Sequence, residues 1–332
     1  MVETDLIARA LDGDGAAFEE LIADHRRGLH AHCYRMLGSL QDAEDALQET
    51  LVGAWRGLAG FAGRSSLRTW LYRIATNASL RLAERRPPRM LSPDHGPAFQ
   101  DVDDLGEPVG GPVWLEPWPD PGDEAAGREQ VELAFVAALA HLPPRPRAVL
   151  LLREVLEFSA AEVAGMLATT VPAVNSALQR ARAAVDARIV EPAQAGELAR
   201  LGPAGRRDLV AAFVRAWERA DVDALVDLLT EDARFAMPPL PAWFEGRADI
   251  ERFAAERMFA TPWRLHPVGA NGQLAFACYQ GPPSGEGLYR LGAINVVTLR
   301  EGRVAAMTGF LDPALGPWFG LPAMSSATAT SP

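Results

Sequence analysis

Lysine is absent from this chain of 332 residues, and arginine supplies all 32 basic side chains. Cysteine is almost absent, because Cys33 and Cys278 are the only two and lie far apart in the sequence. This scarcity excludes a disulfide framework and a zinc site built from cysteines, and it is typical of the cytoplasm. No apolar run approaches the roughly 20 residues of a membrane-spanning helix. The acidic, polar first residues do not predict a secretory signal.

Apolar residues make up 48% of the chain, which is enough to build real cores, and the length predicts two or three domains. The formal net charge of −11 argues against a protein that coats nucleic acid without specificity. The charges are unevenly distributed, however, and their local pattern is more informative than their sum.

Composition divides the first half of the chain into three segments. Residues 4–87 carry apolar side chains at helical spacing and predict a helical domain that stops at Pro87 and Pro88. Residues 88–127 predict an acidic flexible linker, because residues 90–127 hold nine carboxylates and no arginine, with many prolines and glycines. Helical spacing returns over residues 128–191.

The second half of the chain differs in composition and in predicted secondary structure. Residues 192–205 are rich in alanine, glycine and proline and predict a short linker. Residues 206–322 predict two helices, broken near 219–223, and then strands at 273–280, 289–299 and 304–310, with a hairpin turn at Glu301-Gly302. The pattern is typical of a small α+β domain. Residues 323–332 predict a disordered tail.

A basic helix is predicted at the end of the first domain. Seven arginines and one glutamate lie within residues 64–89. Arginine attracts phosphate, asparagine can bond base edges, and aromatic rings can stack on unpaired bases. The candidate nucleic-acid contacts are Arg64, Ser65, Arg68, Trp70, Tyr72, Arg73 and Asn77. A basic face that only meets solvent is the alternative.

The preceding predicted helix, residues 41–55, has the opposite charge. Its outer face carries the candidate protein-binding residues Asp42, Glu44, Asp45, Gln48 and Glu49. An acidic face so close to a basic one suggests two different partners. A charged face exposed to solvent is again the alternative.

Residues 159–187 have the pattern of a helix-turn-helix. Ser159 and Glu162 form a predicted capping box, a short turn follows at 168–170, and Pro172 opens the second helix. The polar faces of that second helix supply the candidate DNA contacts Pro172, Asn175, Ser176, Gln179, Arg180 and Arg182. An ordinary helical hairpin remains the alternative.

Four motifs in this order resemble one family, the extracytoplasmic-function (sigma-70) group of bacterial RNA polymerase sigma factors. They are QDAEDALQET at 41–50, FAGRSSLRTWLYRIATN at 61–77, LPPRPRAV at 142–149 and the segment 159–182. The phrase WLEP at 114–117 and the residues around 312–322 resemble the subgroup with a C-terminal SnoaL-like domain. The resemblance implies a multi-domain fold: two all-α sigma domains, the second with a helix-turn-helix, and then an α+β SnoaL-like cone-shaped barrel.

The resemblance also implies roles. The helix at 41–55 would bind the β′ clamp of core RNA polymerase, and the loop 61–66 with the helix 67–86 would read and melt the −10 promoter element. The helix 171–187 would read the −35 element beside the β flap, and the acidic linker would follow the RNA-exit path. The SnoaL-like domain would contact the sigma core of the same chain and modulate promoter-specific initiation.

Some SnoaL-like domains are enzymes that use an Asp or a His inside the cone. The candidate pocket residues are Trp217, Asp232, Phe235, Trp243, His266, Tyr279 and Tyr289. Aromatic residues at strand spacing are more often core than catalytic, so we expect no enzyme, and a pocket for sensing or a regulatory packing surface instead. We also expect no cofactor and no metal, because His25, His30 and His32 do not share a helical face with further ligands.

Two other functions fit parts of the sequence. A helix-turn-helix regulator that acts without polymerase would not need the acidic helix or the basic one. A SnoaL-type isomerase or hydrolase with a DNA-binding appendage would need polar groups that converge in the cone.

Overall fold

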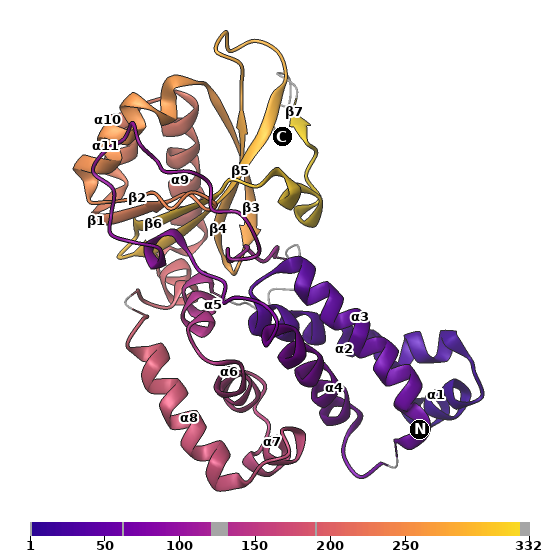
Figure 1. The fold of residues 1–332 in the computed structure, drawn as a ribbon. Coiled ribbons are helices and arrows are strands. Elements are labelled where there is room, and N and C mark those ends of the chain that lie inside the picture. The colour runs from indigo at the N-terminus through magenta and orange to yellow at the C-terminus, as the bar shows by residue number, and fades with distance from the viewer. Residues whose placement is uncertain (1, 62, 121–131, 190, 326–332) are drawn as a thin grey trace. The chain divides into compact units, whose positions relative to one another are not determined.

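The computed structural model describes residues 2–61, 63–120, 132–189 and 191–325. The chain forms two compact units, each made from two separate stretches of sequence. The first contains Met1–Arg89 and Phe135–Ile189, and the second contains Met90–Ala134 and Val190–Pro332 (Figure 1). Among the described residues, no helix is long and apolar enough to cross a membrane.

Helices build the first unit. Its first stretch contains α1 (Val2–Leu11), α2 (Gly15–Leu37), α3 (Leu40–Gly57), the short η1 (Leu58–Gly60) and α4 (Leu67–Ala83). Its second stretch contains most of α5 (Leu133–Ala140), then α6 (Pro144–Leu150), the π-turn η4 (Leu151–Val155), α7 (Ala160–Met166) and α8 (Val171–Asp186).

Side-chain caps fix where the long helices begin. The Asp14 carboxylate accepts hydrogen bonds from the backbone of Ala16 and Ala17, and the hydroxyls of Ser39 and Ser66 do the same at α3 and α4. Each cap satisfies a backbone N–H that has no partner inside the helix. The apolar stripes of α2, α3 and α4 then pack together, in agreement with the helical spacing of apolar residues over 4–87.

The predicted helix-turn-helix is confirmed. The Ser159 hydroxyl accepts from the Glu162 backbone N–H, and the Glu162 carboxylate accepts from the Ser159 backbone, which together make the capping box. The Thr170 hydroxyl caps α8 by accepting from the Ala173 backbone N–H, without a reciprocal bond. Val163 and Val174, on the facing sides of α7 and α8, are fully buried.

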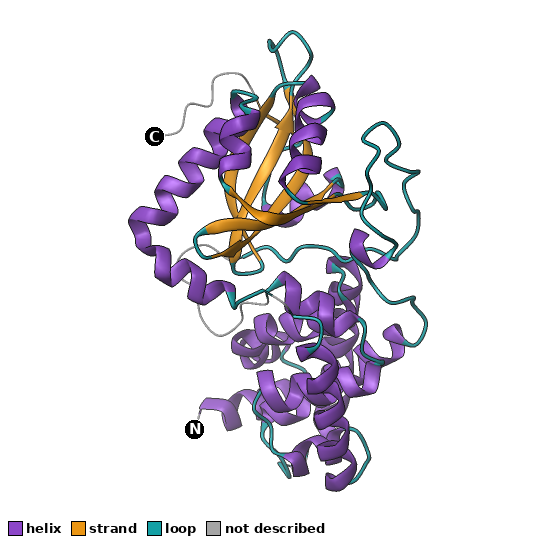
Figure 2. Cartoon of the chain, turned by 90° about the vertical axis from the view of Figure 1, so that its left-hand side faces the viewer, coloured by secondary structure: helices purple, strands orange, loops and turns teal. Residues whose placement is uncertain are grey.

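The second unit is a strongly bent sheet with helices on one side (Figure 2). The strand order is β2-β1-β6-β5-β4-β3, with β7 paired to β5. The strands are β1 (Leu229–Ala236), β2 (Trp243–Glu245), β3 (Trp263–Ala270), β4 (Gln273–Gln280), β5 (Tyr289–Arg300), β6 (Arg303–Phe310) and β7 (Met324–Ser325). The helices are α9 (Gln194–Glu218), α10 (Val222–Asp227) and α11 (Arg247–Glu256), with short 3-10 turns η2 (Ser92–Asp94), η5 (Met258–Ala260) and η6 (Pro313–Phe319).

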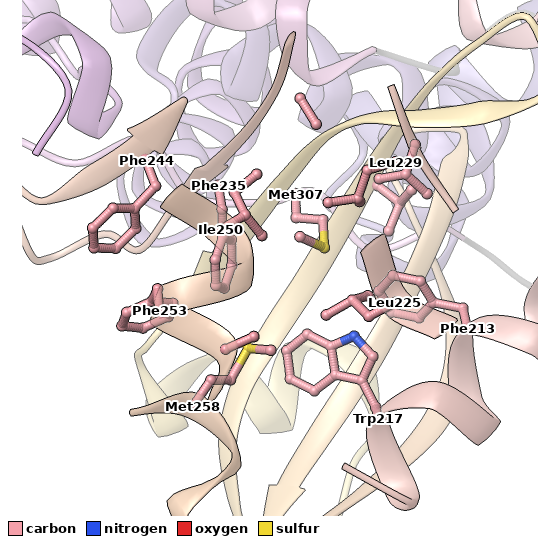
Figure 3. Close-up of a cluster of buried hydrophobic side chains, with 14 of the residues drawn as sticks. Phe213, Trp217, Leu225, Leu229, Phe235, Phe244, Ile250, Phe253, Met258 and Met307 are labelled. Atoms are coloured by element: carbon pink, nitrogen blue, oxygen red, sulfur yellow. The ribbon is translucent and has the colours of Figure 1, made fainter. Parts of the chain in front are cut away.

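Alternate side chains of the strands face the helices and form the core of this unit. Figure 3 shows aromatic rings and methionines from α9, β1, β2, α11 and β6 turned toward one another. Phe213 stacks on Phe276 with ring centroids 4.6 Å apart, and Phe244 stacks on Phe253 at 4.7 Å. The concave face of the sheet is therefore the apolar face.

The expected strands at the C-terminal end are confirmed, and so is the turn between β5 and β6, where Glu301 and Gly302 both have positive φ. The break between two helices is confirmed between α9 and α10. Strands β1, β2 and β3 were not predicted.

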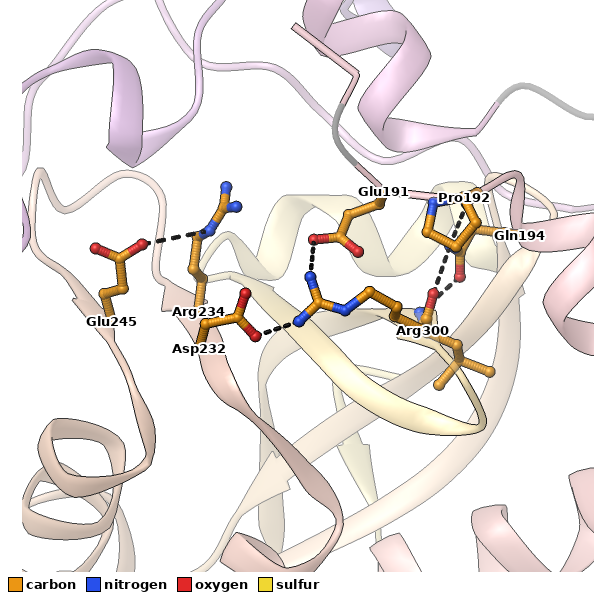
Figure 4. Close-up of polar contacts among 8 residues, drawn as sticks. Glu191, Pro192, Gln194, Asp232, Arg234, Glu245 and Arg300 are labelled. Atoms are coloured by element: carbon orange, nitrogen blue, oxygen red, sulfur yellow. Dashed lines mark hydrogen bonds and ion pairs between the residues drawn. The ribbon is translucent and has the colours of Figure 1, made fainter.

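The structure differs from the short linker expected at 192–205, because most of this segment belongs to α9. Gln194 completes the edge of β5, with its Nε2 3.0 Å from the Leu299 carbonyl and its Oε1 2.6 Å from the Leu299 N–H (Figure 4). The backbone N–H of Gly302 donates to Glu197, which is 2% exposed. These two polar side chains fix the start of α9 to the sheet, so the segment is not a free tether.

The structure also differs from the flexible segment expected at 88–127. Residues 90–120 belong to the second unit and follow its surface in an irregular path. Backbone bonds join Phe99 to Trp243 and Val109 to Pro239, at 2.8 and 3.0 Å. The remainder of the expected linker, residues 121–127, lies outside the described residues.

The tryptophan phrase of this segment also packs inside the second unit. Trp114 is 8% exposed, contacts His95 and donates to the Val109 carbonyl at 2.7 Å. At the end of the segment, Asp120 accepts from the Gly272 N–H with both carboxylate oxygens, at 2.9 and 3.0 Å. We call residues 90–120 the connector.

The tail also differs in part from the disorder expected at 323–332. Met324 and Ser325 form β7 and pair with Arg290 and Tyr289 of β5. Residues 326–332 lie outside the described residues.

Candidate functional site

The acidic face of α3 is smaller than the sequence predicted. Asp45, Gln48 and Glu49 are exposed, and Glu44 is half-buried. The Gln48 amide donates to Glu44 at 3.1 Å, and Arg81 of α4 forms an ion pair with Glu49. The exposed carboxylates are held in place by neighbours and remain accessible from one side.

Asp42 does not belong to that face. It is 3% exposed and forms ion pairs with Arg86, at 3.3 Å, and with Arg89, which is itself buried. Two arginines after the end of α4 therefore close over this carboxylate. The prediction that Asp42 contacts a partner protein is not supported by its position, because burial gives it a structural role.

The candidate DNA contacts around α4 fall into two groups. Arg64, Ser65, Arg68 and Arg73 are exposed, and Asn77 is half-buried. Trp70 and Tyr72 are buried, at 8% and 5% exposure. Trp70 packs on Phe61 with ring centroids 5.1 Å apart. Neither ring is free to stack on a base in this arrangement.

The segment before and within the helix-turn-helix contacts part of this candidate surface. The Arg68 guanidinium lies 4.2 Å above the Phe158 ring and donates to the Leu156 carbonyl at 2.8 Å. The Thr69 hydroxyl donates to the Glu162 carboxylate at 3.0 Å, and Tyr72 meets the Phe158 ring edge-on at 5.5 Å. We call these contacts the closed junction.

A buried histidine packs against the residues of α4 that form the closed junction. His32 is fully buried, and its Nε2 lies 2.9 Å from the Thr76 hydroxyl, which donates its own hydrogen to the Tyr72 carbonyl. His32 Nε2 must therefore carry the hydrogen of its bond to Thr76. Burial lowers the pKa of His32 to about 3, with a smaller contribution from nearby Arg35.

Arg147 is a buried arginine to which the sequence analysis assigned no role. It is 7% exposed, and its guanidinium donates to the carbonyls of Met36 at 2.5 Å, Ala140 at 2.8 Å and Leu142 at 2.9 Å. Burial lowers its pKa to about 10. The repeated arginines in the motif at 142–149 were the available signal.

All six residues predicted to face DNA on α8 are exposed. At about 100° per residue, Pro172, Asn175, Ser176 and Gln179 form a central strip, with Arg180 about 80° to one side and Arg182 about 80° to the other. Arg180 donates to Ser176 at 2.7 Å, and Arg182 forms an ion pair with Glu154 at 2.5 Å. The exposed face of α8 thus places a strip of mainly polar groups between two arginines.

The second unit contains a cavity of about 340 Å³ on the concave face of its sheet. Of the predicted pocket residues, Trp217 and Phe235 line it. The other lining residues are Leu105, Met237, Leu240, Phe253, Arg257, Met258, Trp263, Cys278, Gln280, Gly292, Ala293, Asn295, Gly309 and Leu311.

The other predicted pocket residues lie elsewhere. Asp232 is exposed and paired with Arg300, which holds the pKa of that carboxyl below its ordinary value (Figure 4). His266 packs edge-on to Tyr279, whose hydroxyl donates to the Pro322 carbonyl. Outward-facing positions on the strands explain why these polar residues miss the cavity.

Trp243 and Tyr289 complete the predicted set, and both are buried in other contacts. The Trp243 indole N–H donates to the Gly96 carbonyl of the connector at 2.9 Å, and Tyr289 lies under the Arg264 guanidinium at 4.1 Å. Within the described ranges, no group of three or more His, Cys, Asp or Glu side chains is placed to hold a metal ion.

Three family models match the chain in the order that the motifs suggest. Sigma-70 region 2 matches residues 21–87, Sigma-70 region 4 matches 132–185, and a SnoaL-like domain matches 210–307. The two helical stretches of the first unit and the sheet of the second thus define a sigma factor of the sigma-70 class that carries a SnoaL-like domain.

Similar proteins identify the group of sigma factors more closely. The ECF RNA polymerase sigma factor SigG of Mycobacterium tuberculosis is 44% identical over 322 residues, which cover 93% of this chain and 84% of SigG. The ECF sigma factor SigW of Bacillus subtilis is 27% identical over 180 residues, 54% of this chain and 92% of SigW. The crystal structure of the sigma factor SigJ of Mycobacterium tuberculosis shares the fold, with a TM-score of 0.57 at 21% identity over 90% of this chain and 97% of SigJ.

The chain belongs to the extracytoplasmic-function family of RNA polymerase sigma factors. It acts in transcription initiation, with core RNA polymerase and promoter DNA as its partners.

Proposed function

We propose that α3 binds the β′ clamp of polymerase through Asp45, Gln48 and Glu49, and that α4 reads and opens the −10 element through Arg64, Arg68, Arg73 and Asn77. These side chains lie on α3, on α4 and in the loop before α4, and all of them except the half-buried Asn77 are exposed, which supports separate roles for the two helices. Trp70 and Tyr72 support α4 from the core in the free protein.

The −35 element is read by α8. The polar strip from Pro172 to Gln179 faces the bases, and Arg180 and Arg182 contact phosphates on either side. Arg182 must first leave Glu154, an exchange of one carboxylate for one phosphate that costs little at the surface. The geometry of α8 is the observation that carries this assignment.

The closed junction is a resting state. Arg68 and Thr69, on the DNA-contact side of α4, are bound to Leu156 and Glu162. Promoter DNA and this segment compete for the same side chains. The junction therefore opens when polymerase and promoter together offer better contacts.

The SnoaL-like domain modulates initiation through the connector. The connector joins the two sigma regions in sequence, and residues 90–120 are held by the second unit through Trp243, Asn271 and Gly272. A sigma factor can open only if the chain segment between its two regions is long enough to let them separate. Binding of the connector by the SnoaL-like domain shortens the free length of this segment, and release of the connector restores it.

The cavity serves binding rather than catalysis. The acid and base candidates Asp232 and His266 lie off its wall, and its lining contains no carboxylate and no histidine within the described residues. General acid–base chemistry requires such a group within hydrogen-bond reach of the substrate. We place the protein in the cytoplasm because its partner polymerase acts there.

Runoff transcription with core polymerase and the full chain tests the −10 assignment. Arg73→Ala combined with Asn77→Ala should reduce transcription from duplex promoter, with a smaller loss on a template already unpaired at −10. Equal losses on both templates would instead assign these residues to general backbone contact.

A second comparison tests the connector. Asp120→Ala removes the two bonds to Gly272, whereas Glu107→Ala removes one exposed carboxylate from the same segment. Only Asp120→Ala should change promoter-dependent transcription. If both variants transcribe like the unchanged chain, the connector does not carry regulation.

A further inference from the structure

An amide at the floor of the cavity lacks a hydrogen-bond partner in the part of the chain that the structure describes. Asn295 is 1% exposed and lines the cavity, and neither its Nδ2 nor its Oδ1 has a hydrogen-bond partner among the described residues. Most buried polar side chains in folded proteins have at least one partner. Asn295 is therefore an exception to this rule, with both polar atoms of its side chain unpaired among the described residues.

The strand register shows why the amide faces the cavity. Asn295 of β5 lies opposite Phe276 of β4 and Gly309 of β6. Phe276 belongs to the apolar core on the concave face, and Gly309 lines the cavity. Since Gly309 has no side chain, nothing covers the amide from that strand.

Retaining this group is costly unless something pairs with it. A buried amide without partners is less stable than an apolar side chain of equal size. Trp217, which also lines the cavity, is 4% exposed and has an indole Nε1 without a partner in the described part of the chain. The wall thus contains polar groups that find no partner among the described residues.

We propose that this cavity binds a small, mainly apolar molecule whose neutral amide-like group pairs with the Asn295 carboxamide. A carboxamide offers a donor and an acceptor side by side, and a second amide is its direct complement. The cavity volume of about 340 Å³ suits a ligand of modest size, and such sites combine apolar walls with few polar groups.

The charges around the cavity favour a neutral ligand. Arg257 is the one charged residue in the described lining, and it is exposed and paired with Asp103 of the connector at 3.2 Å. Its charge is thus partly neutralised and lies where water screens it. A charged ligand group would have to lose its hydration beside Phe253 and Trp217 with no opposite charge next to it.

The ligand would contact the connector directly, because Leu105 of the connector forms part of the cavity wall. An effect of the ligand on transcription through this contact rests on the proposed role of the connector. Ligand binding itself does not, so the test below measures binding alone.

Calorimetric titration of the full chain with naphthamide, and with acetonaphthone as a matched ligand that only accepts hydrogen bonds, tests the proposal. Naphthamide should bind about tenfold more tightly, since an added hydrogen bond to a buried group contributes a factor of this size. Asn295→Leu keeps the number and branching of the side-chain heavy atoms and should remove the preference while raising the melting temperature.

Two further variants keep the result interpretable. A Cβ on Gly309 would meet Phe235 at 3.7 Å, an ordinary contact, so Gly309→Ala should fold and weaken binding of both probes by filling space beside Asn295. Thr308→Val makes a polar-to-apolar change on the opposite face of β6 and should leave both affinities unchanged. Failure of naphthamide to bind, or an unchanged preference in Asn295→Leu, would overturn the proposal.

Discussion

The Thr69 hydroxyl on α4 donates to the Glu162 carboxylate on α7 at 3.0 Å, although 93 residues separate them in the sequence. The same carboxylate caps α7 by accepting from the Ser159 backbone, and these hydrogen bonds, those from Ser159 first, lower its pKa. One side chain therefore fixes the start of the helix-turn-helix and ties it to α4. The helix-turn-helix and the helix that we propose reads the −10 element are coupled in the free protein through this carboxylate.

Glu162→Ala should open the closed junction. It removes both the capping box and the contact with Thr69, whereas Ser159→Ala weakens the cap alone. We expect about a tenfold increase in the open population with Glu162→Ala, which corresponds to about 1.4 kcal/mol for a hydrogen bond to a charged group. Fluorescence energy transfer between labels at cysteines introduced at Ala59 and Ala187 would measure it.

Ser159→Ala is the control for Glu162→Ala. If Ser159→Ala opens the junction as much as Glu162→Ala does, loss of helix capping explains the effect and the Thr69 contact is not the latch. The native Cys33 and Cys278 are buried, and burial raises the pKa of both thiols, that of Cys33 to about 12, so they should not compete for the label.

Asp45 and Asp42 should respond differently to substitution. Asp45 is exposed, so Asp45→Arg should weaken binding to core polymerase strongly and leave the unfolding free energy within about 0.5 kcal/mol. Asp42→Asn should do the opposite, because it leaves buried Arg89 without its carboxylate, at a cost of about 3–5 kcal/mol. Pull-down assays and urea unfolding separate the two effects.

Asp24→Arg provides the matched control for charge, since it makes the same change on the exposed side of α2. It should reduce polymerase binding much less than Asp45→Arg. Equal losses would mean that polymerase senses only the overall charge of the chain.

Arg180→Ala should reduce the salt dependence of promoter binding by the holoenzyme. One lost phosphate contact lowers the slope of log affinity against log salt by about one. Arg182→Ala should have a smaller effect, because Arg182 gives up Glu154 when it binds phosphate. Arg188, which follows the end of α8, offers a control, and an Arg180 slope equal to that of Arg188→Ala would contradict the assignment of α8.

Local features of the sequence predicted the helical part of this protein well. Capping residues such as Ser159 and Thr170 act on N–H groups three residues away, so the residues that start a helix can be recognised from a short stretch of sequence. Burial of Asp42 was not predictable in this way, because its partner Arg89 lies 47 residues further along the chain. On a helical wheel, Asp42 and Asp45 both looked like surface residues.

The connector is a second feature that could not be predicted from the sequence. Its attachment to the SnoaL-like domain depends on backbone groups and on Asn271 and Asp120, none of which has a periodic pattern. Composition alone therefore predicted disorder. Asn295 is the opposite case, because an asparagine within the apolar run of β5 was visible in the sequence as an exception and was not used.

His32 should make the helical unit sensitive to acid. Its pKa is about 3 in the folded protein and 6.5 when exposed, so below pH 6.5 the unfolded chain binds a proton that the folded chain does not. Stability therefore falls as the pH falls, by about 1.4 kcal/mol for each unit between these two values. The physical cause is that burial leaves an imidazolium at this position without water, while Arg35 adds a like charge nearby.

His32→Gln keeps a donor for Thr76 and cannot be protonated in this range, so it serves as the comparison. Urea unfolding followed by circular dichroism at about pH 7.5 and about pH 5.5 should show a loss of about 1.4 kcal/mol more in the unchanged chain than in the variant. Other titrating groups are common to both proteins and cancel in the difference. An equal loss in both proteins would show that His32 binds a proton in the folded state, and that Nδ1, which has no partner among the described residues, is accessible to one.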